Sequence, residues 1–164
     1  LVNIWVNHIK LAVPNAKLHI FAGHKTYGGK NKFKIENILS KIADLNDSSI
    51  KLFDPLPKKK LFTKLLVSRS MLYKGDPGET FCLSIAEAQA LGVPCVVKPI
   101  GSLGERVVDK VTGIVANNDK EFYNGAISLL KDDKIWIKYR DNALKLQRDY
   151  KWDKIANQYI DLMN

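Results

Sequence analysis

The sequence MLYKGDPGETFCLSIAEAQALGVPCVVKP, residues 71–99, contains the alternation that decides the fold. A short apolar segment at residues 71–74 is followed by a loop rich in Gly and Pro, and then by an Ala-rich helical segment at residues 84–92. Gly92 stands where a helix C-cap favours glycine, and the β-branched residues of 93–99 predict a second strand. Strand, helix and strand in this order are typical of a right-handed crossover between parallel strands.

The same alternation continues in both directions along the chain. Further strands are expected at residues 16–23, 49–55 and 113–116, and helices at residues 34–45, 58–69, 103–110, 120–131, 133–150 and 153–163. Five apolar strands separated by helices predict an α/β fold, with a Rossmann-like, doubly wound parallel sheet that carries helices on both faces. We expect residues 1–164 to form a single domain of this kind, with its ligand at the carboxyl ends of the strands.

The composition indicates a globular protein and excludes several classes. Lys and Arg number 26 against 17 Asp and Glu, a formal net charge of +9, and 46% of the residues are hydrophobic. Two cysteines, Cys82 and Cys95, cannot build a disulfide scaffold and are typical of a reducing compartment, so we expect a cytoplasmic protein. No apolar run approaches the roughly 20 residues of a membrane-spanning helix. The chain lacks an initiating Met and opens on apolar residues at helical spacing, so we expect a domain truncated at its N-terminus.

Two carboxylates flank the start of the helix expected at residues 84–92. Glu79 falls in the preceding loop, and Glu87 falls about one turn into the helix, eight positions later. At about 1.5 Å per helical residue this spacing spans on the order of 10 Å, roughly a diphosphate with a sugar ring at each end. Between the two carboxylates lie Thr80, Phe81, Cys82 and Leu83.

The amides of these four residues belong to a helix N-terminus, where unpaired N–H groups and the helix dipole favour an anion. Carboxylates repel phosphate but accept hydrogen bonds from the hydroxyls of ribose or hexose, as the acidic residue of dinucleotide sites does. The segment therefore fits a nucleotide sugar. The alternative is ordinary helix chemistry, because Glu near an N-terminus is also favoured by the dipole alone.

Several other residues allow two interpretations, one functional and one structural. His24 follows the turn at Gly23, where a strand ends in the sector that binds ligands, and is either a ligand contact or a solvated loop residue. Gly101 and Gly104 either let the backbone approach a ligand or form the turn into a short helix. No group of His, Cys, Asp and Glu has the spacing of a metal site, so no metal is expected.

The basic residues also have two readings. Lys58, Lys59 and Lys60 form either a solvated surface or a contact with anionic lipid headgroups, worth about 1 kcal/mol per basic residue. No aromatic residues alternate with them and no nucleic-acid-binding motif is present, so no nucleic-acid partner is expected.

Residues 79–97, ETFCLSIAEAQALGVPCVV, resemble the signature of the GT-B glycosyltransferases of family 4, the group 1 transferases. That signature has a Glu, seven residues, a second Glu, a helix of small residues and Gly-x-Pro before an apolar strand. Four further segments are similar to the same family: residues 16–23, 49–61, 104–119 and 149–162. The resemblance therefore extends over nearly the whole chain.

The resemblance implies one half of a GT-B enzyme, the Rossmann-like donor-binding domain, with the acceptor held by a missing N-terminal domain. It implies a retaining hexosyltransferase that uses a nucleotide-diphospho-sugar, such as a UDP-sugar, without a bound metal or other cofactor. It places Glu79, as the catalytic residue, on the hydroxyls of the donor sugar, Glu87 on the ribose, and the backbone near Leu56 against the base. The amides between the two glutamates would contact the sugar and the distal phosphate. The acceptor would be a glycan or lipid-linked molecule of cell-surface polysaccharide or lipopolysaccharide synthesis, which makes peripheral attachment to the inner membrane face an expectation.

Two departures from the family pattern bear on activity. The family often has Gly where this chain has Cys82, whose side chain either crowds the phosphate or packs beneath it. The basic residues that grip the diphosphate in the family lie before the start of this chain, so we expect these 164 residues alone to be inactive and to bind donor weakly. A sugar-nucleotide epimerase on the same scaffold and a non-catalytic module that binds a nucleotide or a partner protein remain the alternatives.

Overall fold

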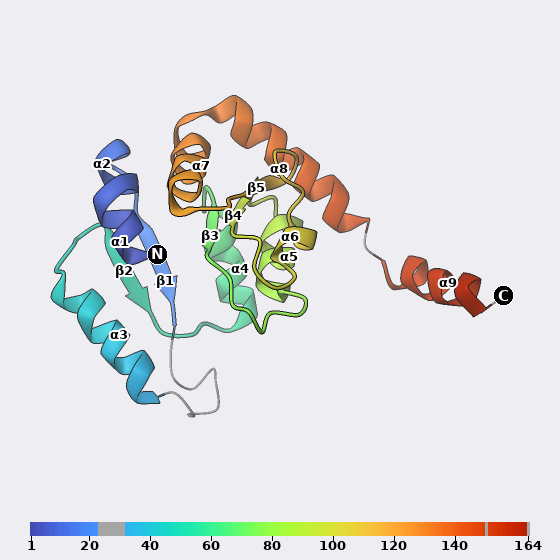
Figure 1. Ribbon diagram of the computed structural model, residues 1–164, viewed down its shortest axis with the longest axis horizontal. Coiled ribbons are helices and arrows are strands. Elements are labelled where there is room, and N and C mark those ends of the chain that lie inside the picture. The colour runs from blue at the N-terminus through green and yellow to red at the C-terminus, as the bar shows by residue number, and fades with distance from the viewer. Residues whose placement is uncertain (23–31, 150, 164) are drawn as a thin grey trace. The chain divides into compact units, whose positions relative to one another are not determined.

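The computed structural model describes residues 1–22, 32–149 and 151–163 (Figure 1). The chain divides into two compact units, Leu1–Lys64 and Leu65–Asn164. Each is described by itself.

The first unit contains a two-stranded parallel sheet. Its elements are α1 (Val2–Ile4), the π-helix η1 (Trp5–Ile9), α2 (Lys10–Ala12), β1 (Leu18–Phe21), α3 (Lys32–Asp44), β2 (Ile50–Phe53) and most of α4 (Lys58–Leu66). In the ladder Leu18 lies opposite Ile50 and Phe21 opposite Phe53. The π-helix is fixed by Trp5, which is buried and donates its indole N–H to Ser49 Oγ at 2.9 Å.

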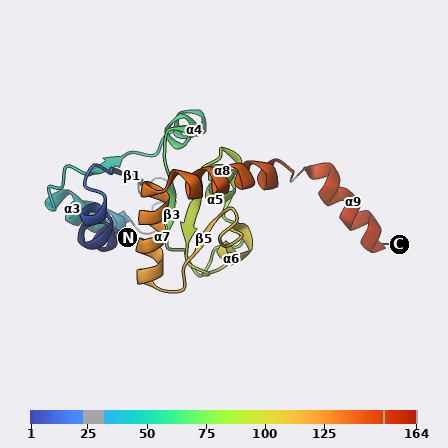
Figure 2. The same ribbon diagram turned by 90° about the horizontal axis from the view of Figure 1, so that it is seen from above.

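The second unit contains a three-stranded parallel sheet in the order β3–β4–β5. Its elements are β3 (Met71–Tyr73), α5 (Leu83–Ala90), β4 (Cys95–Val97), α6 (Leu103–Arg106), β5 (Gly113–Val115), α7 (Asp119–Lys131), α8 (Asp133–Arg148) and α9 (Trp152–Met163). Met71, Cys95 and Gly113 lie side by side across the sheet. In both views the strands lie between α7 on one side and α6 on the other (Figures 1 and 2).

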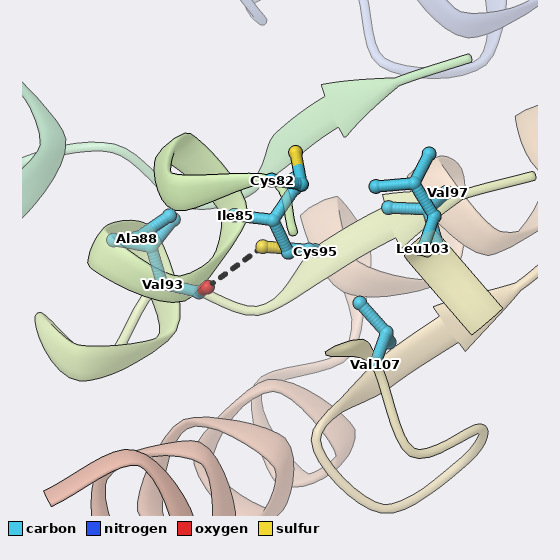
Figure 3. Close-up of a cluster of buried hydrophobic side chains, with 8 residues drawn as sticks. All are labelled: Cys82, Ile85, Ala88, Val93, Cys95, Val97, Leu103 and Val107. Carbon is cyan, nitrogen blue, oxygen red and sulfur yellow. Dashed lines mark hydrogen bonds between the residues drawn. The ribbon is translucent and has the colours of Figure 1, made fainter. Parts of the chain in front are cut away.

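Apolar side chains of β4 and of its flanking helices form the core of this unit (Figure 3). The buried cluster consists of Cys82, Ile85, Ala88, Val93, Cys95, Val97, Leu103 and Val107. Because α5 supplies two of these side chains, Ile85 and Ala88, and Cys82 directly precedes it, its position is set by the core. Gly92, in the left-handed conformation at φ +77°, ends α5 as expected and returns the chain to β4.

These features confirm the expected α/β fold with Rossmann-like parallel strands and helices. All five expected strands are present, and their ladders run within the two units. That residues 1–164 act as one domain stays a prediction.

Candidate functional site

Glu79 lies in the loop that leaves the carboxyl end of β3. Both oxygens of its carboxylate accept a hydrogen bond: Oε1 from the backbone N–H of Cys82 at 3.1 Å, and Oε2 from the hydroxyl of Tyr73 at 3.2 Å. Burial, together with the hydrogen bond to Glu79, raises the pKa of Tyr73 to about 12. The tyrosine is therefore a neutral donor at physiological pH, and the carboxylate is held at two points.

The backbone of this loop is held independently of that carboxylate. The N–H of Glu79 donates to the carbonyl of Asp76 at 3.0 Å, and the N–H of Ser102 donates to the carbonyl of Glu79 at 3.0 Å. Gly101, at φ +59°, packs against the Glu79 backbone and precedes α6, in which Gly104 lies. Of the two readings of Gly101, the structure supports the turn into a short helix, packed on protein backbone.

Cys82 adopts the left-handed conformation, φ 58° and ψ 69°, as the residue that precedes α5. This conformation explains why glycine suits the position. The side chain is 2% exposed and belongs to the core cluster, so it packs beneath the loop. Burial raises the pKa of the Cys82 thiol, which therefore behaves as an apolar core group.

The N-terminus of α5 is open to solvent. The side chains of Phe81 and Leu83 are 47% and 64% exposed, and Thr80 is exposed as well. No atom in the described part of the chain accepts a hydrogen bond from the amides of these three residues. Free N–H groups at the positive end of a helix can bind an anionic ligand.

Glu87 lies one turn into α5, as expected, and is half-buried. It lines a cleft with a volume of about 420 Å³. The other lining residues are Phe81, Ala86, Ala90, Arg106, Gln147, Trp152 and Ile155. The Arg106 guanidinium lies 4.0 Å from the centre of the Phe81 ring. The structure thus brings two expected site residues, Phe81 and Glu87, to one cleft, whereas Glu79 is not among the residues that line it.

Three expected site residues remain: Leu56, Gly23 and His24. Leu56 is half-buried in the segment between β2 and α4, in the first unit. Gly23 and His24 lie outside the described residues. The roles of all the named site residues stay predictions.

The sequence analysis missed a group of charges at the carboxyl ends of the three strands. Lys74 directly follows β3, Lys98 directly follows β4, and Asp119 begins α7 after β5. Asp119 pairs with Lys98 at 2.5 Å and with Lys74 at 3.2 Å. These two lysines lower the pKa of Asp119, Lys98 being the larger cause. A lysine directly after the last apolar residue of an expected strand is the signal that would have identified them.

Among the described residues, no group of three or more His, Cys, Asp and Glu side chains is arranged to hold a metal ion. No helix in the described ranges combines the length and apolar character needed to cross a membrane.

Comparison with protein families decides the assignment. Residues 6–146 match the family described as glycosyl transferases group 1. The chain belongs to this family. This match confirms the resemblance to the group 1 transferases that the two-glutamate segment indicated, and it extends over residues 6–146 of this group 1 glycosyl transferase.

Curated relatives of this group 1 glycosyl transferase are longer proteins. It is 28% identical over 118 residues to the D-inositol 3-phosphate glycosyltransferase of Corynebacterium efficiens, covering 71% of this chain and 28% of that protein. The enzyme of the same name from Corynebacterium glutamicum is also 28% identical, over 122 residues that are 72% of this chain and 28% of the relative. The chain therefore spans under a third of the length of these relatives.

Solved structures share the fold. The sucrose-phosphate synthase of Thermosynechococcus elongatus superposes with a TM-score of 0.75 at 18% identity, over 98% of this chain and 41% of that one. Anabaena Alr3699/HepE, solved in complex with UDP, superposes with a TM-score of 0.74 at 16% identity, over 98% of this chain and 44% of that one. At these low identities the likeness establishes only the fold of this group 1 glycosyl transferase.

Proposed function

We propose that this chain is the donor-binding part of a retaining glycosyltransferase, which transfers a hexose from a nucleotide-diphospho-sugar. The observation that carries the proposal is the solvent-open N-terminus of α5, with the carboxylates of Glu79 and Glu87 before and within its first turns. Membership of the group 1 glycosyl transferases supports the same conclusion.

Each part of the donor has a chemically suited partner in this proposal. The amides of Thr80, Phe81 and Leu83 bind the sugar and the distal phosphate, since they are free donors at the positive end of α5. The Cys82 amide, expected in the same role, donates to Glu79 instead. Glu79 accepts hydrogen bonds from the sugar hydroxyls, and Glu87 from the ribose hydroxyls, because ionised carboxylates only accept. The backbone near Leu56 is proposed to face the base, and Gly23 and His24 are proposed to contact the donor.

We propose UDP as the nucleotide. The support comes from structures of the same fold: Anabaena Alr3699/HepE was solved with UDP and with UDP-glucose, and the pneumococcal O-GlcNAc transferase GtfA with UDP and GlcNAc. The nucleotide sugar is a substrate, and no resident metal or cofactor is proposed.

The acceptor side of the proposal concerns a longer protein, because the chain spans 28% of its first curated relative. We propose a glycan or lipid-linked acceptor, consistent with a role in cell-surface polysaccharide or lipopolysaccharide synthesis. The exposed lysines Lys58, Lys59 and Lys60 at the start of α4 support peripheral contact with anionic lipid on the cytoplasmic face.

The proposal is tested by titrating the ¹⁵N-labelled chain with UDP and with GDP up to millimolar concentration, following the amide resonances. UDP is expected to shift the resonances of residues 80–84 and to saturate at a lower concentration than GDP. Glu87→Gln should weaken UDP binding about tenfold, because hydrogen bonds to a charged group are lost. Glu36→Gln, an exposed glutamate of α3, is the matched control and should bind as the wild type does. Absence of shifts at residues 80–84, or equal affinity in Glu87→Gln, contradicts the proposal.

A further inference from the structure

Tyr73 has a backbone and ring held in place by the sheet and the core, and a hydroxyl that contacts Glu79. It is the last residue of β3 and lies opposite Val97 in the ladder to β4. Its ring packs against the buried cluster of the second unit, which fixes the direction of the side chain. Its hydroxyl donates to Glu79 Oε2 at 3.2 Å, across the loop of residues 74–82.

Among the described residues, the Tyr73 hydroxyl makes no other hydrogen bond to this loop. The Glu79 backbone is already tied to Asp76 and to Ser102, and the N–H of Gly78 donates to Asp76 Oδ1 at 2.8 Å. The effect of the Tyr73 hydroxyl is therefore concentrated on one carboxylate oxygen. A glutamate side chain left to itself samples several rotamers, and ordering it on binding costs conformational entropy.

The two hydrogen bonds leave acceptor capacity for a ligand. An ionised carboxylate has about four lone-pair sites, and two of those on Glu79 are taken by the Cys82 N–H and the Tyr73 hydroxyl. Each oxygen therefore keeps room for one further donor. Two adjacent hydroxyls of a sugar ring match such a pair of oxygens, provided that the carboxylate is held in one orientation.

We infer that Tyr73 is a positioning residue, which orients the Glu79 carboxylate toward two adjacent hydroxyls of the donor sugar. The inference rests on the proposed function, since it names what one side of that site recognises. It assigns Tyr73 no contact with the nucleotide. Loss of its hydroxyl should therefore affect the sugar and spare the UDP.

The experiment compares UDP with UDP-glucose on the whole chain, by amide-resonance titration of the wild type, Tyr73→Phe, Glu79→Gln and the double variant. Tyr73→Phe keeps the ring in the core and removes the hydroxyl. We expect it to weaken UDP-glucose about three- to tenfold relative to UDP, the size of one net hydrogen bond. Glu79→Gln should change the same ratio, and adding Tyr73→Phe to it should change the ratio little further. Tyr139→Phe, which removes the hydroxyl of a buried tyrosine of α8, is the control and should leave the ratio unchanged.

The outcomes separate this inference from the proposed function. If the wild type binds neither UDP nor UDP-glucose, the proposed function fails and the inference fails with it. If the wild type binds both and the ratio in Tyr73→Phe equals that of the wild type, the inference alone is overturned. Equal weakening of both ligands also overturns it, because it would show a merely structural role. Should Tyr73→Phe fail to fold, Glu79→Gln decides, because an unchanged ratio there removes the group on which Tyr73 is inferred to act.

Discussion

Gly101 lies directly against the backbone of Glu79: a Cβ added at Gly101 would stand 2.5 Å from the Glu79 carbonyl oxygen and 3.1 Å from the Glu79 Cβ. Real side chains do not approach a carbonyl oxygen this closely. Gly101 is also at φ +59°, where L-residues are strained. The position of the Glu79 loop therefore depends on the absence of a side chain at residue 101.

Gly101→Ala is expected to destabilise the protein by about 1–3 kcal/mol from the backbone conformation alone, and to displace the Glu79 loop. Urea denaturation measures the first effect, and the amide resonances of residues 76–82 report the second. Gly104→Ala is the matched control, because its Cβ would meet nothing closer than 3.8 Å and the residue is helical. The control should lie within about 1 kcal/mol of the wild type, toward greater stability. Equal effects of the two variants would refute the tight contact.

The left-handed conformation of Cys82 predicts an unusual order of stabilities. Cys82→Ala keeps the strained φ of 58° and loses the buried sulfur, whereas Cys82→Gly loses one more carbon but relieves about 1–2 kcal/mol of strain. We expect the glycine variant to be at least as stable as the alanine variant, as measured by urea denaturation. At Cys95, fully buried within β4, the order should reverse, because glycine there gains no relief and weakens a strand. A glycine variant less stable than alanine at both positions would contradict the explanation.

The sequence was sufficient for the elements but not for every boundary. The helix expected at residues 103–110 ends at Arg106 in the structure. Val107 turns to an extended conformation and enters the core, and Lys110 adopts a positive φ of 58°. The spacing of the apolar residues could not predict this boundary. A buried valine at residue 107 fits the pattern whether it continues a helix or follows the end of a short one.

The candidate site was predictable in its residue types and less so in its contacts. Glu79 in the loop and Glu87 in α5 follow from the pattern of strand, loop and helix. The hydrogen bonds of Glu79 to the Cys82 amide and to Tyr73 do not, because they depend on a left-handed backbone and on which face of β3 the tyrosine occupies. Whether the Cys82 side chain crowds the phosphate or packs beneath it could not be predicted from the sequence. Its burial, which favours the second, depends on how the core is packed.

Ser49→Ala tests whether the hydrogen bond from Trp5 to Ser49 holds the N-terminal helical segment of the first unit in place. Trp5 and Ser49 are each 2% exposed, so removing the hydroxyl leaves the indole N–H buried without its acceptor. The expected loss of stability is about 1–3 kcal/mol, measured by guanidinium denaturation. Ser48→Ala, at the exposed neighbouring residue, should change stability by less than about 0.5 kcal/mol. A similar small effect of Ser49→Ala would show that the hydrogen bond contributes nothing net.

Asp47 predicts how acid affects the same unit. Its Oδ1 accepts from Lys10 Nζ at 2.6 Å and from the N–H of Ser49 at 2.8 Å. These contacts, the lysine first, lower the pKa of Asp47 from 3.8 to about 2. Because the pKa is depressed in the folded state, this stabilisation is complete above about pH 5 and is lost as the pH falls toward 2. An NMR titration of the Asp47 carboxyl carbon should therefore show its inflection near 2.

The same linkage predicts a difference between variants in acid. The urea midpoint of the wild type should fall more steeply between pH 5 and pH 2.5 than that of Asp47→Asn, because asparagine has no proton to gain. Asp44→Asn removes an exposed carboxylate from the end of α3 and serves as the control for the change in net charge. Its midpoint should follow the wild type, because the group that it removes makes neither the Lys10 nor the Ser49 contact. Parallel acid curves for the wild type and Asp47→Asn would mean that the contacts of Asp47 persist in the unfolded chain or do not form in the folded one.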